Sequence, residues 1–359
     1  MILMKKVLVV DDSALMRRVL CDIINSDGRF TVKDEAVNGL DALEKIQQNQ
    51  YDAVVLDVNM PKMDGIELLK ELKRRKIRSH ILMASTDTMD GAQVTLDALE
   101  LGAMDVIHKP DWSYQCRDAV FKDRFLELLY AVCISKVQEK HEEDDKKTAE
   151  SLKSIEKILH KESGRIAGNK IVAIACSTGG PKALQSVLPS LPEDIKAPIV
   201  LVQHMPVGFT LSFAQRLNSL CRLEVKEAEE GDVLEAGHVY IARGGFHMNL
   251  VKNGKETIVH YTEDPYREGV RPSANYMYES LAECGYDEVV CVVMTGMGAD
   301  GTQGILHLKD KKKIYVITQD SESCVVNGMP KSAVKAGVSN QSVPLPLIAQ
   351  EIILHVGVK

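Results

Sequence analysis

The sequence lacks any apolar run long enough to cross a membrane, because no uninterrupted stretch approaches the roughly 20 residues that a spanning helix needs. Near the N-terminus only four apolar residues separate Lys6 from Asp11, too few for the core of a secretory signal. The eight cysteines include no Cys-x-x-Cys pair, which argues against a zinc knuckle or a disulfide framework. These absences predict a cytoplasmic protein that is not embedded in a membrane.

An excess of basic charge is also absent. The 44 Lys and Arg residues are outnumbered by 51 Asp and Glu residues, so the formal net charge is −7. No global field therefore attracts nucleic acid, and we expect no nucleic-acid partner. Charged residues make up 26% and aromatic residues 5%, which is ordinary for an α/β protein and excludes collagen-like or wholly disordered chains.

Two globular domains are expected from the length of 359 residues, since a domain usually holds roughly 100–200. The segment 139–165 contains 15 charged residues among 27, a composition that cannot bury enough apolar surface to form a core. We therefore predict domains at 1–136 and 166–359, joined by a charged linker at 137–165. Apolar residues recur at helical spacing within 152–159, so a short amphipathic helix stays open there as an alternative.

The first domain alternates short apolar runs with amphipathic segments of three-four spacing. The expected strands are 6–10, 31–36, 53–56, 80–84 and 106–107. The expected helices between them are 14–24, 39–48, 65–74 and 91–101. This order predicts a doubly wound, five-stranded parallel sheet, whose functional residues gather at the carboxyl ends of the strands.

The second domain begins in the same way, with a strand that runs into a Gly-rich turn and a helix. The expected strands are 170–175, 198–202, 289–294 and 314–318, with a helix from 302 to about 308. The middle stretch 223–261 has short alternating runs and glycine turns, which predict antiparallel strands. We expect a second doubly wound α/β domain that contains an antiparallel hairpin region.

Acidic side chains follow two of the expected strands in the first domain. Asp11 and Asp12 come after the first strand, and Asp57 comes after the third; Ser85 and Lys109 follow the fourth and fifth. Three carboxylates at one sheet edge repel one another unless a hard cation lies among them. Mg²⁺ prefers oxygen ligands and takes one or two carboxylates directly. The pattern predicts a magnesium site, with a lysine opposite that can contact an anionic group.

These strand ends carry a family resemblance. The segments VVDDS, VVLDVNMPKMDG, ILMAS and GAMDVIHKP, within residues 5 to about 136, resemble the receiver domain of response regulators. The resemblance implies a CheY-like, flavodoxin-type fold in which Asp57 accepts phosphate from a histidine kinase. The implied Mg²⁺ ligands are Asp12, Asp57 and the main-chain oxygen of Asn59, with Asp11 acting through water. The implied switch hydroxyl and phosphoryl-binding lysine are Ser85 and Lys109.

A Gly-x-Gly-x-x-Gly motif at 296–301 follows an expected strand and opens an expected helix. Asp320 lies 19 residues beyond Gly301, so the motif meets most criteria of a dinucleotide-binding fingerprint. Asp300, however, stands where the pyrophosphate of a dinucleotide has to bind, and it adds a negative charge there. An NAD-binding protein is therefore only a weak alternative.

A hydrolytic interpretation uses the same loop differently. Ser177 follows a strand and precedes a tight turn, as in a nucleophile elbow, and the next strand ends at His204. Together with Asp300, three strand ends present a serine, a base and a carboxylate, which a serine nucleophile requires. His247 is a rival base that equally suits a substrate contact. Cys176 is more simply a small buried residue than a thiol nucleophile.

The second domain also resembles a known family. From about residue 170 to the C-terminus, the chain contains IVAIACSTGGPKAL, IVLVQHMP, GHVYIARGGFHMNLV, VRPSANYMYESLA, VVMTGMGADGTQGI and ITQDSESCVVNGMPKSAVKAG. These segments resemble the catalytic domain of the chemotaxis protein-glutamate methylesterases, and the order receiver, linker, esterase matches the CheB family. The resemblance implies that Ser177 is the nucleophile, His204 the base and Asp300 the partner of that base. It also implies that Thr178 and the backbone near Met297 line the oxyanion site, and that His247 lies at the substrate site. The sequence departs from the family pattern at Arg243, Asn275 and 311–313, and we expect the triad to be untouched.

The resemblance implies a serine-type methylesterase, activated by phosphorylation, that hydrolyses glutamate γ-methyl esters on chemoreceptors. The same acyl chemistry permits deamidation of receptor glutamines. It implies Mg²⁺ in the receiver and no cofactor in the catalytic domain. The alternative of another class is a receiver-controlled regulator without enzymatic activity, against which the intact triad argues.

Overall fold

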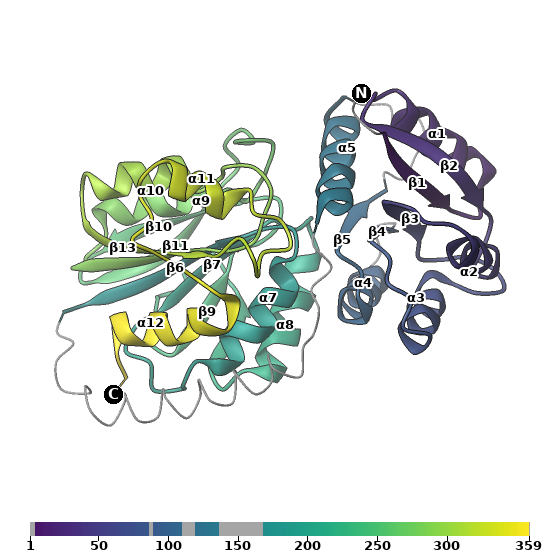
Figure 1. The fold of residues 1–359 in the computed structure, drawn as a ribbon. Helices are drawn as coiled ribbons and strands as arrows, with labels where there is room; N and C mark the ends of the chain where they lie inside the picture. Colours follow the sequence, from purple (N-terminus) through teal and green to yellow (C-terminus); the bar gives the residue numbers. More distant parts are fainter. Residues whose placement is uncertain (1–3, 86–88, 110–118, 136–167, 359) are drawn as a thin grey trace. The chain divides into compact units, whose positions relative to one another are not determined.

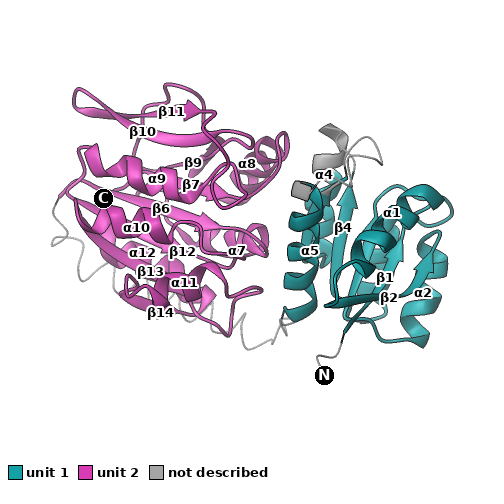
Figure 2. Ribbon diagram, turned by 90° about the horizontal axis from the view of Figure 1, so that it is seen from above, with its two compact units in different colours: residues 1–137 teal, residues 138–359 magenta. Residues whose placement is uncertain are grey.

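The structure is a computed structural model that describes residues 4–85, 89–109, 119–135 and 168–358. It divides into two compact units, Met1–Val137 and Gln138–Lys359 (Figure 2). The expected linker at 137–165, with its alternative helix at 152–159, lies outside the described residues. In the described ranges, no helix is both long and apolar enough to cross a membrane.

The first unit contains a five-stranded parallel sheet of order β2-β1-β3-β4-β5 (Figure 1). Its strands are β1 (Lys5–Val10), β2 (Phe30–Ala36), β3 (Ala53–Asp57), β4 (Ile81–Ser85) and β5 (Asp105–His108). Its helices are α1 (Ala14–Asn25), α2 (Gly39–Gln48), α3 (Gly65–Arg74), α4 (Met89–Leu101) and α5 (Ala119–Ile134). Helix α1 packs beside α5, while α2, α3 and α4 pack in a row. The predicted doubly wound sheet is confirmed.

Polar residues that follow the strands of this unit start the next helices. The Ser13 hydroxyl accepts a hydrogen bond from the main-chain N–H of Met16 at the start of α1. The Asn38 side chain caps α2 in the same manner, and Asp64 forms a capping box with Glu67 at the start of α3. Such caps satisfy amide groups that the first turn of a helix leaves free. The junctions that lead into α1, α2 and α3 are therefore encoded locally.

The second unit contains a seven-stranded sheet of order β14-β13-β12-β6-β7-β9-β8, with every pairing parallel. Its strands are β6 (Lys170–Cys176), β7 (Ile199–Gln203), β8 (Glu224–Glu227), β9 (His238–Ile241), β12 (Glu288–Val293), β13 (Lys313–Gln319) and β14 (Gln341–Val343). A separate hairpin pairs β10 (His247–Asn253) with β11 (Glu256–Thr262).

Helices cover both faces of this sheet (Figure 1). They are α7 (Gly180–Val187), α8 (Phe209–Leu220), α9 (Ala274–Ser280), α10 (Thr302–Lys309), α11 (Met329–Lys335) and α12 (Ile348–Val356), with 3₁₀ turns η2 (Leu188–Ser190), η3 (Leu281–Glu283) and η4 (Leu345–Leu347). Helices α9, α10 and α11 lie on one face, and α7, α8 and α12 lie on the other. The predicted α/β fold with an antiparallel hairpin region is confirmed.

The prediction of antiparallel strands throughout 223–261 is wrong in part. Strands β8 and β9 join the main sheet in parallel, and only β10 and β11 are antiparallel. Strand β8 is an edge strand, and only Val225 of its four residues is buried. A short edge strand of a parallel sheet can therefore be as polar as a half-exposed antiparallel strand, so its sequence does not reveal its direction.

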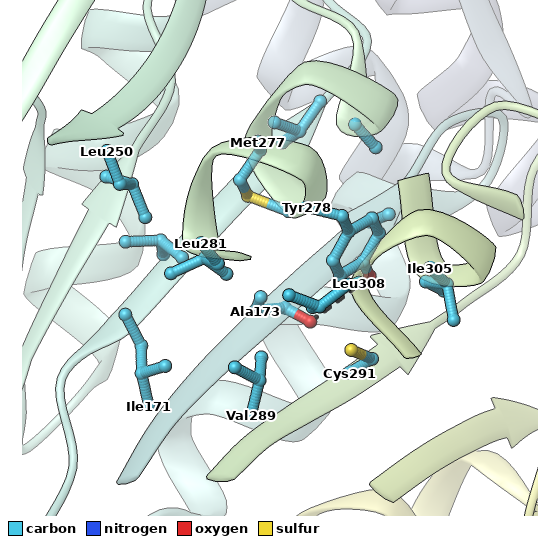
Figure 3. Packing of buried hydrophobic residues seen from close by; sticks show 14 of the residues in the cluster. Ile171, Ala173, Leu250, Met277, Tyr278, Leu281, Val289, Cys291, Ile305 and Leu308 are labelled. Carbon is cyan, nitrogen blue, oxygen red and sulfur yellow. Dashed lines mark hydrogen bonds between the residues drawn. The ribbon is translucent and has the colours of Figure 1, made fainter. Parts of the chain in front are cut away.

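Helix α9 is held to the sheet by a buried tyrosine (Figure 3). Tyr278 is fully buried, and its hydroxyl lies 3.2 Å from the main-chain oxygen of Ala173 in β6 and 3.1 Å from that of Val292 in β12. Leu281, Ile171 and Val289 belong to the same apolar cluster. The contact fixes α9 across β6 and β12, and it places the first turn of α9 beside the loop that follows β12.

Candidate functional site

In the first unit, three carboxylates meet at the carboxyl edge of the sheet. Asp11 and Asp12 follow β1, and Asp57 ends the neighbouring strand β3. One ligand oxygen of each residue lies within 4.8 Å of the other two. Asp11 and Asp57 are buried, whereas Asp12 is exposed. Clustered carboxylate oxygens with one open side are the donor set that a hard cation such as Mg²⁺ requires.

Lys109 bridges two of these carboxylates. Its Nζ lies 2.9 Å from Oδ2 of Asp11 and 2.7 Å from Oδ1 of Asp57, and the side chain is buried. Burial alone lowers the pKa of Lys109, but the charges of Asp57 and Asp11 raise it above its ordinary value. Burial raises the pKa of Asp57, and the charge of Lys109 opposes this rise without cancelling it.

The other residues expected at this site lie at neighbouring strand ends. Ser85 is the buried last residue of β4, and its main-chain oxygen accepts a 2.7 Å hydrogen bond from the N–H of Lys109. Asn59 is exposed in the loop after β3. Sequence reasoning missed Gly65, where a Cβ atom would lie 2.3 Å from the main-chain oxygen of Asp57. Only glycine lets the start of α3 approach the phosphoacceptor candidate so closely.

In the second unit, the three triad candidates follow three neighbouring strands. Ser177 comes directly after β6, His204 comes directly after β7, and Asp300 lies in the loop between β12 and α10. The sheet order places β6 between β12 and β7. His204 Nε2 lies 2.8 Å from Oδ2 of Asp300, and both side chains are almost completely buried. The structure thus pairs the predicted base with its predicted partner.

Asp300 accepts three further hydrogen bonds from the start of α9. The Ser273 hydroxyl donates at 2.6 Å, the N–H of Ala274 at 2.6 Å and the N–H of Asn275 at 3.1 Å. Burial alone raises the pKa of Asp300, but the bonds from His204, Ser273 and Ala274 hold that pKa below its ordinary value. The base partner is therefore a carboxylate that stays ionised.

Asn275, one of the departures from the family pattern, lies beside the triad candidate Asp300. Its main-chain N–H contacts Asp300, and its Oδ1 accepts hydrogen bonds from the N–H groups of Gly301 and Gly304. Sequence reasoning also missed Ser273, because that residue follows no strand. The available signal was a serine directly before an amphipathic helix, where such a residue caps the helix.

The turn around Ser177 is tight. Its N–H donates to the main-chain oxygen of Thr295 at 3.0 Å, and its own oxygen accepts from Gly180 N–H at 2.7 Å. Gly179 has a φ of 76°, a left-handed conformation that favours glycine. At Gly296 a Cβ atom would lie 2.9 Å from Cβ of Ser177. Ser177 therefore lies in a tight turn between β6 and α7, the strand-to-helix position predicted for a nucleophile.

The oxyanion candidates lie on both sides of this turn. Thr178 is buried, and its Oγ1 has no hydrogen-bond partner among the described residues. Met297 is half-buried and follows Gly296 in the loop that also carries Asp300. A buried hydroxyl without a partner is costly, so its position next to a nucleophile candidate calls for a ligand.

His247 contradicts the expectation of a substrate contact or rival base. The residue is fully buried at the start of β10. Its Nδ1 accepts from the N–H of Ser273 at 3.1 Å, and its Nε2 lies 3.2 Å from the main-chain oxygen of Pro265. Burial lowers the pKa of His247, which keeps the ring neutral. Both ring nitrogens are used within the fold, so His247 supports the Ser273 segment that holds Asp300.

Cys176 and the glycine motif also have structural roles. Cys176 is fully buried, and burial raises the pKa of its thiol well above the ordinary range, so little nucleophilic thiolate is present. Gly301 precedes α10 with a φ of 91°, as the motif requires. Asp300, however, occupies the loop beside it and is bonded to His204. The NAD-binding alternative is therefore not favoured.

Comparison with known proteins agrees with this geometry. Residues 172–352 match the family model described as CheB methylesterase, and residues 7–120 match that of the response regulator receiver domain. Relatives named protein-glutamate methylesterase/protein-glutamine glutaminase from Pyrococcus horikoshii and Halalkalibacterium halodurans are each 42% identical to the chain over 348 residues. These matches cover 97% of the chain, and 92% and 97% of the respective relatives. The chain belongs to the CheB methylesterase family.

A solved CheB structure matches the second unit. The catalytic domain of the Thermotoga maritima CheB methylesterase is 41% identical, with a TM-score of 0.50. The match covers 52% of this chain and 99% of that one. The predicted family and the α/β fold of the second unit are thus confirmed. Since a receiver model also matches, CheB-type architecture accounts for both units.

Proposed function

We propose that the protein is a serine-type methylesterase that hydrolyses glutamate γ-methyl esters on chemoreceptors and is activated by phosphorylation of its receiver. The observation that carries this proposal is the buried 2.8 Å contact between His204 and Asp300, on strands that flank the one leading to Ser177. The names of the relatives, protein-glutamate methylesterase/protein-glutamine glutaminase, supply the substrate class.

Ser177 is the proposed nucleophile and His204 the proposed base. Because Asp300 accepts from Nε2 of His204, that nitrogen carries the ring proton and Nδ1 is left basic. Nδ1 takes the proton of the Ser177 hydroxyl as Oγ attacks the ester carbonyl. The ionised Asp300 then stabilises the imidazolium that forms. Its three other hydrogen bonds keep it in place while this charge develops.

The tetrahedral intermediate carries a negative oxygen, for which Thr178 and the main-chain N–H of Met297 are the proposed donors. The unpartnered Oγ1 of Thr178 supports this assignment. Donors aimed at a developing oxyanion typically contribute factors of about 10²–10³ to kcat. We place no role at His247, whose two ring nitrogens are already engaged.

Collapse of the intermediate expels methanol, which takes its proton from the His204 imidazolium. Water then attacks the acyl-enzyme with His204 again as base, which releases the glutamate carboxylate and restores Ser177. A glutamine side chain passes through the same acyl-enzyme with ammonia as the leaving group. The relatives' second name, protein-glutamine glutaminase, supports this additional deamidase activity.

For the receiver we propose that Asp57 accepts phosphate from a histidine kinase. The proposed Mg²⁺ ligands are Asp12, Asp57 and the main-chain oxygen of Asn59, with Asp11 acting through water. The clustering of three carboxylates supports this set. The cation supplies positive charge that offsets the negative charge of the phosphoryl group. Lys109, which already contacts Asp57, contacts that group, and Ser85 is the proposed switch hydroxyl.

We also propose that the receiver domain spans 1–136 and the catalytic domain 166–359.

The test of the whole proposal is release of radiolabelled methanol from methylated receptor membranes by the full chain, before and after incubation with a phosphodonor and Mg²⁺. Release that depends on the protein supports the esterase. A protein that leaves the label on the receptors acts instead as a non-enzymatic regulator, and the proposal fails.

A further inference from the structure

The last pair of residues that joins β6 to β7 lies directly before Ser177 and His204. Cys176 pairs with Gln203 in the parallel register, and the N–H of His204 donates to the main-chain oxygen of Cys176 at 3.2 Å. Beyond this pair of residues, the segment after β6 turns at Ser177 into α7, and the segment after β7 continues past His204 toward α8. The nucleophile and the base therefore sit where the two strands separate.

The side-chain amide of Gln203 spans this separation. Its Nε2 donates to the main-chain oxygen of Ser177 at 3.1 Å and to that of His204 at 3.2 Å. A primary amide nitrogen carries two protons, so these two bonds use both. Gln203 is 1% exposed. Water therefore offers little competition for the two bonds.

Two neighbours determine how this amide is oriented. The Cys176 thiol donates to Oε1 of Gln203 across 3.1 Å. In the reversed orientation Oε1 would face two carbonyl oxygens, which is repulsive, so the bonding pattern selects one orientation. On the other side, a Cβ atom at Gly180 would lie 2.1 Å from Oε1. The absence of a side chain at Gly180 leaves the room that the amide occupies.

We propose that Gln203 is a positioning residue that holds the main chains of Ser177 and His204 at the separation that proton transfer between them requires. The inference rests on the proposed esterase function and deepens it. Gln203 acts through the two residues and does not touch the substrate. A displacement of about 1 Å between reacting groups can lower a rate about 10²-fold. The two hydrogen bonds of Gln203 to the main chains of Ser177 and His204 therefore affect the chemical step.

The test compares Gln203→Glu with the full-length parent protein in the methanol-release assay. The substitution keeps the length of the side chain and an oxygen that accepts from Cys176, but it removes both N–H donors. We expect kcat to fall by roughly 10–100-fold while KM stays within about twofold, because binding groups are unchanged. Phosphonylation of Ser177 by a small fluorophosphonate, which needs no receptor, should slow by the same factor.

Gly180→Ala provides a second route to the same defect. It leaves Gln203 intact but pushes its amide away, and it should lower kcat and the phosphonylation rate in parallel. If Gln203→Glu does not fold, Gly180→Ala still tests the positioning role. The matched control is Thr318→Val, since Thr318 is equally buried in β13 and its hydroxyl bonds to Ser339 and Gln341, which lie outside the triad and its supports. It should lose comparable thermal stability yet keep kcat within about threefold.

The outcomes are distinct. If the parent protein releases methanol but Gln203→Glu and Gly180→Ala both retain kcat within about threefold, the positioning role is overturned. An equal loss of kcat in Thr318→Val also overturns it, because the effect then follows from general destabilisation. A parent protein that releases no methanol contradicts the esterase function itself. A selective fall in kcat and in phosphonylation supports the inference.

Discussion

At the scale of single residues, the site depends on which atoms face one another. Asp300 lies 2.8 Å from Nε2 of His204, which leaves Nδ1 as the nitrogen proposed to act on Ser177. Cys176 is the last residue of β6 and comes directly before Ser177, and it is fully buried. One position along the chain therefore separates a buried structural thiol from a hydroxyl at the end of the sheet, because successive side chains of a strand point to opposite faces.

Replacement of the nucleophile tests this distinction. Ser177→Ala should lower methanol release by about 10³-fold or more, since the acyl-enzyme can no longer form. The fold and the phosphorylation of the receiver should be unchanged. Cys176→Ala is the matched neighbour and should retain activity within about fivefold, because it removes only the weak bonds of a thiol to Gln203 and to the main-chain oxygen of Val202. The assignment of Ser177 as the nucleophile is refuted if Ser177→Ala is active and Cys176→Ala is inactive.

The low pKa of Asp300 predicts how acid affects the second unit. A carboxyl group whose pKa is lower in the folded state stabilises the fold above its unfolded pKa of about 3.9, and this contribution disappears as the pH falls through the folded pKa. Hydrogen-exchange protection of β6 and β12, corrected for intrinsic exchange, should therefore fall as the pH drops from about 5 through the folded pKa of Asp300. In Asp300→Asn this fall should be smaller; an identical pH dependence in both proteins would contradict the assigned direction.

At the scale of elements, strand ends and helix starts assemble the site together. Strands β12, β6 and β7 deliver the triad candidates, while the first turn of α9 orients Asp300. The strand contribution was predictable because parallel strands share a carboxyl edge. The contribution of α9 was not, since its approach to Asp300 depends on the buried contact of Tyr278 with β6 and β12.

The buried hydroxyl of Tyr278 provides a test of this contact. Tyr278→Phe keeps the ring in the core but removes the hydrogen bonding to Ala173 and Val292. We expect a loss of about 0.5–1.5 kcal/mol in the free energy of unfolding of the second unit. Tyr278→Ala should cost about 3–5 kcal/mol, because it also leaves a cavity. Urea unfolding measures both, and equal losses in the two variants would show that the hydroxyl, rather than the ring, holds α9.

At the scale of the whole molecule, two units with separate sites lie on one chain. Each unit has its own sheet, and the candidate site residues of each lie at the carboxyl edge of that sheet. Family models for a receiver and for a methylesterase match the two parts in that order. A receiver that changes the activity of the esterase couples two sites, and such coupling typically changes an equilibrium by about 5–150-fold.

Phosphorylation tests the coupling. Incubation with acetyl phosphate and Mg²⁺ should label Asp57 and raise methanol release by about 5–150-fold. Asp57→Asn should abolish both the label and the increase while basal release remains. Chelation of the cation with EDTA should have the same effect on labelling, because the carboxylate cluster then lacks its cation. Labelling that persists in Asp57→Asn or in EDTA would exclude Asp57 as the magnesium-dependent phosphoacceptor.

The two α/β units and the residues at their strand ends could be predicted from the sequence, because apolar periodicity and helix caps are local signals and parallel strands share a carboxyl edge. The sequence indicated Ser177, His204 and Asp300 as a triad because they follow strands that share a carboxyl edge. Tertiary structure alone decided the parallel direction of β8 and β9, the burial of His247 and the bonds of Gln203 to two main chains. These features depend on which distant segments lie side by side, and a hydrogen bond between them leaves no periodic signal in either segment.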